Sequence, residues 1–322
     1  MLTEQEKETF KFYFNLESKD ETQVTENLLQ ILDTAKSLLP CSDFTNIKSS
    51  NASDANTIHN VFKFDSSFWK YNKTFKSKTV LDHSKFNTTN QNGIILDTLT
   101  FKSTKTTDSS SVWAGRATII DLLEFESVPD FLDKFILNLT GLRLNYTDDK
   151  YSVDNIIDPF LHTKNESKYI EYIQSYKTLN FKNNTANDND NSTLFIDDTG
   201  FLINVSLIYK LSPILALRKF NEYIFTSLPI TGDDGIISIF LISLVSQDSN
   251  SGDNNAQNLV IGKYFSIEKL EINLISKKLI WKMITLSDSG GYLPKFIQNM
   301  AICKEISHDV PNFMEYLLKE II

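Results

Sequence analysis

One segment of the sequence places apolar side chains at every second position. These are Phe201, Ile203, Val205, Leu207 and Tyr209. Because the side chains of a β-strand point alternately to opposite faces, the pattern predicts a strand with one face in a hydrophobic core. Further extended segments follow at short intervals, at 216–226, 236–245, 260–267, 270–275 and 279–285. The last two are separated by the short turn 276–278, and the spacing is typical of an antiparallel meander.

The first half of the chain mixes helical and extended patterns. Apolar residues recur at a helical period in the first forty residues, which end at Pro40. Segments rich in β-branched and aromatic residues predict strands at 57–64, 94–101 and 112–125. After Pro129 an amphipathic pattern predicts a helix that Gly141 could end, and a second helix is expected near 168–176. The Asn- and Asp-rich stretch around 181–193 is interpreted as a disordered insertion.

The C-terminal segment changes to a helical period. Residues 287–289 supply capping side chains, Gly290 and Gly291 a turn, and Pro294 a suitable first helical residue. Two glycines before Pro294 would let the chain reverse sharply from strand to helix. Pro311 is expected to kink the helix or restart it.

Composition excludes several classes of function. The 322 residues are 41% hydrophobic with a net charge of -9, so a core is expected and phosphate backbones are repelled. Nucleic acid is therefore not an expected partner.

Without an N-terminal apolar segment or a spanning run, we expect a cytoplasmic protein, peripheral at organelle membranes at most, with transient membrane contact left open. Cys41 and Cys303 are expected to be reduced thiols.

The sequence carries no motif for catalysis or for a cofactor. Its four histidines lack metal-ligand spacing, and it has no nucleophile elbow, phosphate loop or dinucleotide fingerprint. We therefore expect no metal, no cofactor and no enzymatic activity.

Several motifs in the last hundred residues resemble one known superfamily. The turn at Pro213 followed by Arg218, the strand 264–268, and the run from Trp281 into 287–294 are similar to the START-like, or helix-grip, pattern. Asp309-Val310-Pro311-x-Phe313, with Trp113 and Arg116, narrows the resemblance to a fungal START-like family of uncharacterised role. The correspondence is good over 201–318 and weaker over 57–139.

The resemblance implies an α+β, START-like helix-grip fold. A curved antiparallel sheet would wrap around a long C-terminal helix and enclose a hydrophobic cavity. The resemblance does not extend to residues 1–40, which are expected from their helical period to form helices packed on a single domain at 41–322. The helix and the loop 246–258 would gate the cavity.

Arg116 lies in an apolar strand and needs a partner if its charge faces the interior. Glu268 is the expected partner, and the pair could orient the polar head of an amphiphile. Strict alternation could instead place either residue on the solvent face. Arg218 is expected to tie down nearby carbonyl groups. The candidate ligand-binding residues, either polar anchors or cavity lining, are Trp113, Arg116, Tyr264, Glu268, Trp281, Met283, Leu293, Phe296, Ile297 and Met300.

The leading hypothesis is therefore a non-enzymatic carrier or sensor of a hydrophobic ligand. A sterol, a phospholipid, an acylglycerol or a quinone would each fit, and the sequence predicts no oligomeric state. The alternative is a filled START-like scaffold that acts as a protein-interaction module, which predicts a cavity too small for a ligand. An enzyme on the same frame would require polar residues with perturbed pKa values to converge inside the cavity.

Overall fold

The computed structural model describes residues 3–47, 62–63, 67–79, 94–106, 111–147, 150–181, 193–247 and 259–321. Within these ranges the main sheet has twelve strands, with the path β1-β2-β3-β14-β13-β11-β9-β8-β6. Neighbours along this path pair antiparallel, whereas β12 runs parallel to β9. The α+β class, with an antiparallel sheet and a long C-terminal helix, is confirmed.

The bounds of the elements follow. The helices are α1 (Glu4–Tyr13), α2 (Glu21–Thr25), α3 (Leu28–Leu38), α5 (Val128–Thr140), α6 (Leu161–Tyr169) and α7 (Lys295–Tyr316), with the short turns η1 (Phe44–Asn46), η2 (Leu122–Glu124) and η3 (Leu317–Ile321). The strands are β1 (Trp69–Thr79), β2 (Ile94–Thr106), β3 (Val112–Asp121), β4 (Leu142–Thr147), β5 (Lys150–Ile156), β6 (Ile173–Leu179), β7 (Leu194–Asp197), β8 (Gly200–Tyr209), β9 (Leu217–Ser227), β10 (Ile230–Thr231), β11 (Ile237–Val245), β12 (Leu259–Ile261), β13 (Lys263–Asn273) and β14 (Lys278–Asp288).

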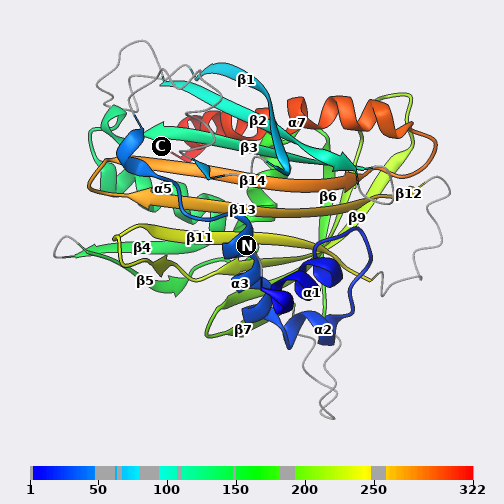
Figure 1. Cartoon of the computed structure of the whole chain (residues 1–322), viewed down its shortest axis with the longest axis horizontal. Helices are drawn as coiled ribbons and strands as arrows, with labels where there is room; N and C mark the ends of the chain where they lie inside the picture. The colour runs from blue at the N-terminus through cyan, green and yellow to red at the C-terminus, as the bar shows by residue number, and fades with distance from the viewer. Residues whose placement is uncertain are drawn as a thin grey trace.

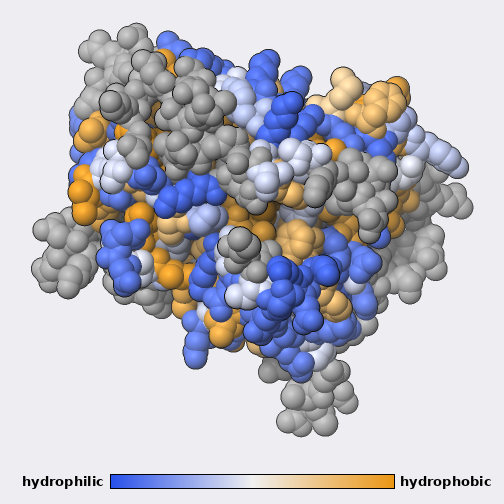
Figure 2. Space-filling model, viewed as in Figure 1, coloured by the Kyte–Doolittle hydropathy of each residue, from blue (hydrophilic) through white to orange (hydrophobic). Residues whose placement is uncertain are grey.

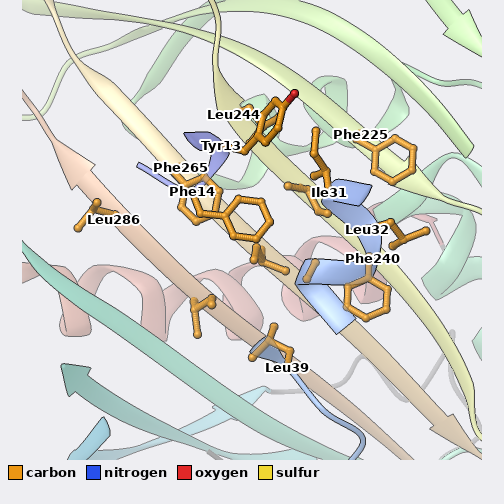
Figure 3. Packing of buried hydrophobic residues seen from close by; sticks show 14 of the residues in the cluster. Tyr13, Phe14, Ile31, Leu32, Leu39, Phe225, Phe240, Leu244, Phe265 and Leu286 are labelled. Carbon is orange, nitrogen blue, oxygen red and sulfur yellow. The ribbon is translucent and has the colours of Figure 1, made fainter. Parts of the chain in front are cut away.

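Helices cover both faces of the sheet (Figure 1). In β13, Phe265 and Ile267 belong to the core formed with α1 and α3, whereas Leu270 and Ile272 belong to the core formed with α5 and the end of α7. Figure 3 shows Phe14 and Ile31 of the N-terminal segment among sheet side chains such as Phe265. We call the face under α1–α3 the outer face and the face under α5–α7 the inner face.

A buried group of charges ties the N-terminal segment to the outer face. Glu271 has no exposed surface, and its carboxylate lies 2.7 Å from Lys269 Nζ and 3.3 Å from Lys282 Nζ. The two ammonium groups also donate to the carbonyl oxygens of Leu39, at 3.0 Å, and Pro40, at 2.7 Å. Burial opposes ionisation, but the lysines lower the pKa of Glu271, while burial lowers the pKa of Lys282 to about 8.

The turn before α7 depends on backbone that only glycine adopts easily. Gly290 and Gly291 have φ of +66° and +65°, and a Cβ on Gly290 would lie 2.3 Å from the Ile261 carbonyl oxygen. Arg218 braces this turn, because its Nε donates to the Ser289 carbonyl at 3.4 Å. The expected carbonyl-tying role of Arg218 is confirmed. Beyond the turn, α7 continues through Pro311 without the restart that the sequence suggested.

Several segments differ from the expected secondary structure. Residues 168–176 are not a helix, because α6 ends at Tyr169 and β6 begins at Ile173. The sequence analysis also did not predict β1, β4 and β5, whose residues are largely polar. Most of the expected strand at 57–64, of the insertion at 181–193 and of the loop at 246–258 lies outside the described residues.

Replacing Glu271 with Gln should destabilise the protein strongly. The change leaves Lys269 and Lys282 buried without a compensating anion, which costs about 3 to 5 kcal/mol of unfolding free energy. Chemical denaturation measures the loss. The matched control is Glu315→Gln, in an exposed ion pair with Lys319, which should change stability by less than about 0.5 kcal/mol. A similar effect of both variants would contradict the proposed role of the buried charges.

Candidate functional site

The inner face carries a buried ion pair between β3 and β13, the two strands that flank β14. Arg116 of β3 donates from one terminal nitrogen to Glu268 Oε2 of β13 at 2.9 Å. The same oxygen accepts from Trp281 Nε1 of β14 at 2.7 Å, and the guanidinium lies 4.4 Å from the centre of the Trp281 ring. Arg116 is only 1% exposed, so placement on the solvent face is excluded for this residue. The prediction that Glu268 is its partner is confirmed.

Asp309 of α7 faces this pair from the helix side. Its Oδ2 lies 3.9 Å from Arg116 Nε, which is an ion pair beyond hydrogen-bond distance. Arg116 Nε and the second terminal nitrogen of Arg116 have no hydrogen-bond acceptor among the described residues. We call Arg116, Glu268, Trp281 and Asp309 the interior polar cluster. The Arg116 guanidinium therefore retains donor capacity that the described protein atoms do not use.

Burial and neighbouring charges perturb the acids around this cluster. Burial raises the pKa of Asp309 to about 8, reinforced by Glu268 and Glu166 and opposed by Arg116. Burial, followed by the charge of Glu166, raises the pKa of Glu222 well above its usual value. The pKa of Glu166 is itself raised, chiefly by burial and less by Glu268, while His162 opposes the shift.

Helix α6 holds Glu166 in place beside the cluster. Asn165 donates to the Asn138 carbonyl of α5 at 2.9 Å, and Tyr316 of α7 donates to the side-chain oxygen of Asn165 at 2.9 Å. His162 Nδ1 lies 2.8 Å from the Leu139 carbonyl oxygen. These bonds fix α6 between α5 and α7, so the Glu166 side chain is positioned by three helices.

Tyrosine side chains complete the polar part of the inner face. Tyr264 of β13, Tyr209 of β8 and Tyr169 of α6 all have pKa values raised well above the usual range, first by burial and then by nearby carboxylates. At neutral pH they are therefore hydroxyl groups that can donate or accept hydrogen bonds.

The structure divides the predicted ligand-binding residues into three groups. Arg116, Glu268, Trp281, Met283 and Tyr264 lie on the inner face, the last two beside the part of α7 around Cys303 and Ile306. Trp113 lies on the outer face, because its position in β3 has the opposite parity to that of Arg116. Its ring stacks on the Phe10 ring, with the ring centroids 5.9 Å apart. The third group lies just before and at the start of α7, and its first member, Leu293, is partly exposed.

The third group does not face the interior, contrary to expectation. Phe296, Ile297 and Met300 on the first turns of α7 are 65%, 42% and 72% exposed. The helix instead turns Cys303 and Ile306 toward the sheet. The sequence analysis correctly placed these apolar residues on one side of a helix. The part of α7 that packs against the sheet begins later in the helix.

Sequence reasoning missed Glu166, Glu222 and Tyr209 as members of the site. Glu222 shares the parity of Ile224 in β9, so its inward direction was readable once that strand was assigned. Tyr209 was placed on the apolar face of its strand but was not selected as a polar residue. Glu166 lies on the polar helix α6, but the sequence analysis expected a helix near 168–176 instead. No sequence signal identified Glu166 as a site residue.

The arrangement can hold a polar group in a largely desolvated setting. Arg116 offers donors, the tyrosines offer hydroxyl groups, and acids with raised pKa values can donate when protonated. Among the described residues no group of three His, Cys, Asp or Glu side chains is arranged to hold a metal ion.

The raised pKa of Asp309 predicts a measurable pH dependence. Between its ordinary value of 3.8 and its folded value of about 8, the folded protein keeps a proton that the unfolded chain has released. The contribution of Asp309 to stability is therefore full below about pH 3.8, is lost progressively between 3.8 and about 8, and changes little above that. Unfolding free energies of the wild type and Asp309→Asn, measured from about pH 5 to about pH 9, should show the wild type losing stability relative to the variant. A constant difference across this range would show that Asp309 titrates normally.

The chain matches one protein-family model and is similar in structure to several solved proteins. Residues 157–317, half of the chain, match the model of a family described as "Protein of unknown function (DUF3074)". No curated protein matches the sequence. Human STARD10 is similar in structure, with 8% identity, a TM-score of 0.47, and coverage of 85% of this chain and 82% of that one. Human StAR-related lipid transfer protein 5 has 12% identity, a TM-score of 0.46, and coverage of 81% and 90%.

A bacterial protein is also similar. It is the STAR-related lipid transfer protein of Xanthomonas axonopodis, with 9% identity, a TM-score of 0.42, and coverage of 77% of this chain and 98% of that one. Among the described residues no helix has the length and apolar character needed to cross a bilayer.

Proposed function

This chain belongs to the protein family of unknown function DUF3074, and we propose from the geometry of its own residues that it binds a hydrophobic, lipid-like ligand between the inner face of the sheet and α7. The observation that carries the proposal is the interior polar cluster. Its members lie between secondary-structure elements, and yet two of them keep solvent-accessible surface. The side chains of Glu268 and Asp309 are 12% and 26% exposed.

These exposed fractions support a hollow rather than a solid interior. The Glu166 side chain, held between three helices, is also 21% exposed, although burial raises its pKa. In addition, the backbone of α7 approaches β1, β2, β3 and α6, whereas Glu222 belongs to β9, farther along the sheet path. Space between α7 and β9 would account for both observations.

The apolar surroundings favour a ligand that is mostly hydrocarbon. Phe135 of α5 and Phe313 of α7 pack edge-on against the Trp281 ring, at centroid distances of 5.9 and 5.6 Å. Few polar groups in an otherwise apolar site are typical of small-molecule pockets. Transfer of apolar ligand surface from water contributes about 25 cal/mol per Å², before the costs of association are subtracted. Sterols, acylglycerols, phospholipids and quinones are the ligand classes to test.

Mass spectrometry of solvent extracts from the purified protein tests the proposal directly. We expect an apolar molecule to co-purify, and Glu268→Gln should lower its occupancy by about tenfold by weakening the charge that holds Arg116. Asp121→Asn is the matched control, because the Asp121 pair with Lys278 lies at the end of β3, outside the cluster. Equal ligand occupancy in the wild type and in both variants would show that the interior polar cluster does not contribute to ligand binding. Recovery of no ligand, with no binding in a lipid panel, would favour the scaffold alternative.

We further propose that the exposed start of α7 contacts a membrane while ligand is exchanged. Phe296 and Met300 are largely exposed there, Tyr292 just before them is fully exposed, and Ile261 of β12 is 53% exposed. Figure 2 shows apolar surface at the upper right, over the N-terminal part of α7. The net charge of -9 favours a zwitterionic bilayer over an anionic one.

Vesicle flotation with phosphatidylcholine checks this contact. The double variant Phe296→Asp/Met300→Asp should reduce the bound fraction by about tenfold, because two apolar side chains lose their membrane burial. Ile275→Asp is the control, since Ile275 is 90% exposed at the opposite end of the β13–β14 hairpin. An equal reduction by the control, or no reduction by the double variant, would contradict membrane contact at α7.

A further inference from the structure

Strand β1 concentrates positive charge in a chain whose net charge is -9. It contains four lysines and no acidic residue, and all four lysines are exposed. Only Lys76 has an acidic partner in the described part of the chain, the Asp97 carboxylate at 3.8 Å, and that pair is itself exposed. We use the name lysine edge for Lys70, Lys73, Lys76 and Lys78.

The lysine edge lies where the sheet can accept another strand. β1 begins the path of the main sheet, and β2 is the one described strand that pairs with it. In an antiparallel pair, the N–H and C=O groups of alternate residues point away from the partner strand. On the far side of β1 these groups have no described strand to pair with, so an added strand would satisfy them. Figure 1 draws β1 at the upper margin of the sheet, and Figure 2 shows hydrophilic surface there.

The first two lysines of the edge point to the inner face, because directly paired residues share a face of the sheet. Lys70 pairs with Lys102, whose Nζ donates to a carbonyl oxygen of α7 at 2.6 Å. Lys73 pairs with Thr100, which in turn pairs with Arg116 of the inner face. The register of β1 shifts between these two lysines, and a bulge of this kind keeps them on one face.

The other two lysines point to the outer face. Lys76 and Lys78 pair with Asp97 and Ile95 of β2. Both of these partners have the parity of Leu99, which belongs to the core formed with α1 and α3. The positive charge is therefore divided between the two faces, along about 25 Å of one strand.

This two-sided arrangement selects the class of partner. A bilayer laid on either face of the sheet would meet only two of the four lysines, and one that met the edge would offer no strand to pair with its backbone groups. An extended peptide in the plane of the sheet directs its side chains alternately to both faces, so it can reach all four lysines. We propose that β1 binds an acidic, extended segment of a partner protein as an additional strand of the sheet.

The charges also define which segments would bind. Acidic side chains on both faces of the added strand would complement the lysine edge, whereas the β1 strand of a second copy would be repelled by it. Proline would be absent from the paired residues, because it has no N–H group to donate. The surface is separate from the interior polar cluster, so docking goes beyond the proposed function and does not depend on a bound lipid.

Fluorescence anisotropy with the full chain tests the docking. The probe is a short labelled peptide of repeated glutamate–glutamate–threonine units, which places carboxylates on both faces of an extended strand. We expect it to bind about tenfold more tightly than the same peptide with glutamine in place of glutamate, and less tightly as salt is added. A third peptide keeps every carboxylate but carries N-methyl groups on its backbone. Since it cannot donate to β1, its binding should be lost.

Two variants with the same change in net charge separate the lysine edge from the general field of the protein. Replacing all four lysines of the edge with glutamine should weaken binding of the acidic peptide about tenfold. The control replaces four exposed lysines elsewhere and should leave the affinity unchanged within about twofold. The control substitutions are Lys11→Gln, Lys164→Gln, Lys177→Gln and Lys263→Gln. Circular dichroism establishes that both variants are folded.

Several results would overturn the proposal. No binding of the acidic peptide, or equal weakening by both variants, would show that the lysine edge is not a docking surface. Undiminished binding of the N-methylated peptide would exclude strand addition. Binding of phosphatidylserine vesicles in preference to the peptide, with loss in the edge variant alone, would assign the lysines to a membrane. Dimers that sedimentation detects in the wild type but not in the edge variant would assign β1 to a second copy of this chain.

Discussion

Burial of the Arg116 guanidinium is the constraint on which the inner face depends. A charge with 1% exposure is tolerated only where hydrogen bonds and opposite charge offset its desolvation. β13 supplies Glu268, β14 supplies the Trp281 ring, and α7 supplies Asp309, so three elements are placed by one side chain. The strand order β3-β14-β13 brings these groups together, and the helix turn at Gly290 sets the course of α7 above them.

The two faces of the sheet deal with buried charge in different ways. On the outer face, Glu271 is enclosed by Lys269 and Lys282, which also satisfy carbonyl oxygens of the N-terminal segment. That arrangement is closed, and its role is to fasten α1–α3 to the sheet. On the inner face, Arg116 keeps donors that find no acceptor in the described part of the chain, and Asp309 keeps exposed surface. An incompletely satisfied cluster is the arrangement expected where a ligand contributes the remaining bonds.

Much of the fold was predictable because it depends on local patterns. The alternation that ends at Tyr209, the β13–β14 hairpin, Gly141 at the end of α5 and the Gly290 turn all have short-range physical causes, and each is confirmed. β1 was missed because it lies at the start of the sheet path, where most of its side chains are polar. α6 was displaced because its residues have weak amphipathic character and are held by tertiary bonds such as that from Tyr316 to Asn165.

The site was less predictable than the fold. The Arg116 pair was recoverable, since a lone charge in an apolar strand demands a partner. The direction of α7 was not, because an amphipathic helix shows which of its sides is apolar but not how much of that side the sheet covers. Phe296 and Met300 are consequently exposed, while Cys303 is covered. Trp113, named as a candidate cavity or anchor residue, packs on the outer face with the N-terminal segment.

The two members of the central ion pair are separated by 152 residues in the chain. Arg116 can meet Glu268 only after β3 has joined β14, a step that closes a very long loop and depends on most of the intervening polypeptide. Any molecule held at this junction has affinity for the completed architecture and none for its separate halves. A bound ligand would therefore couple the segments that carry Arg116 and Glu268 into one cooperative unit and slow their separation during unfolding.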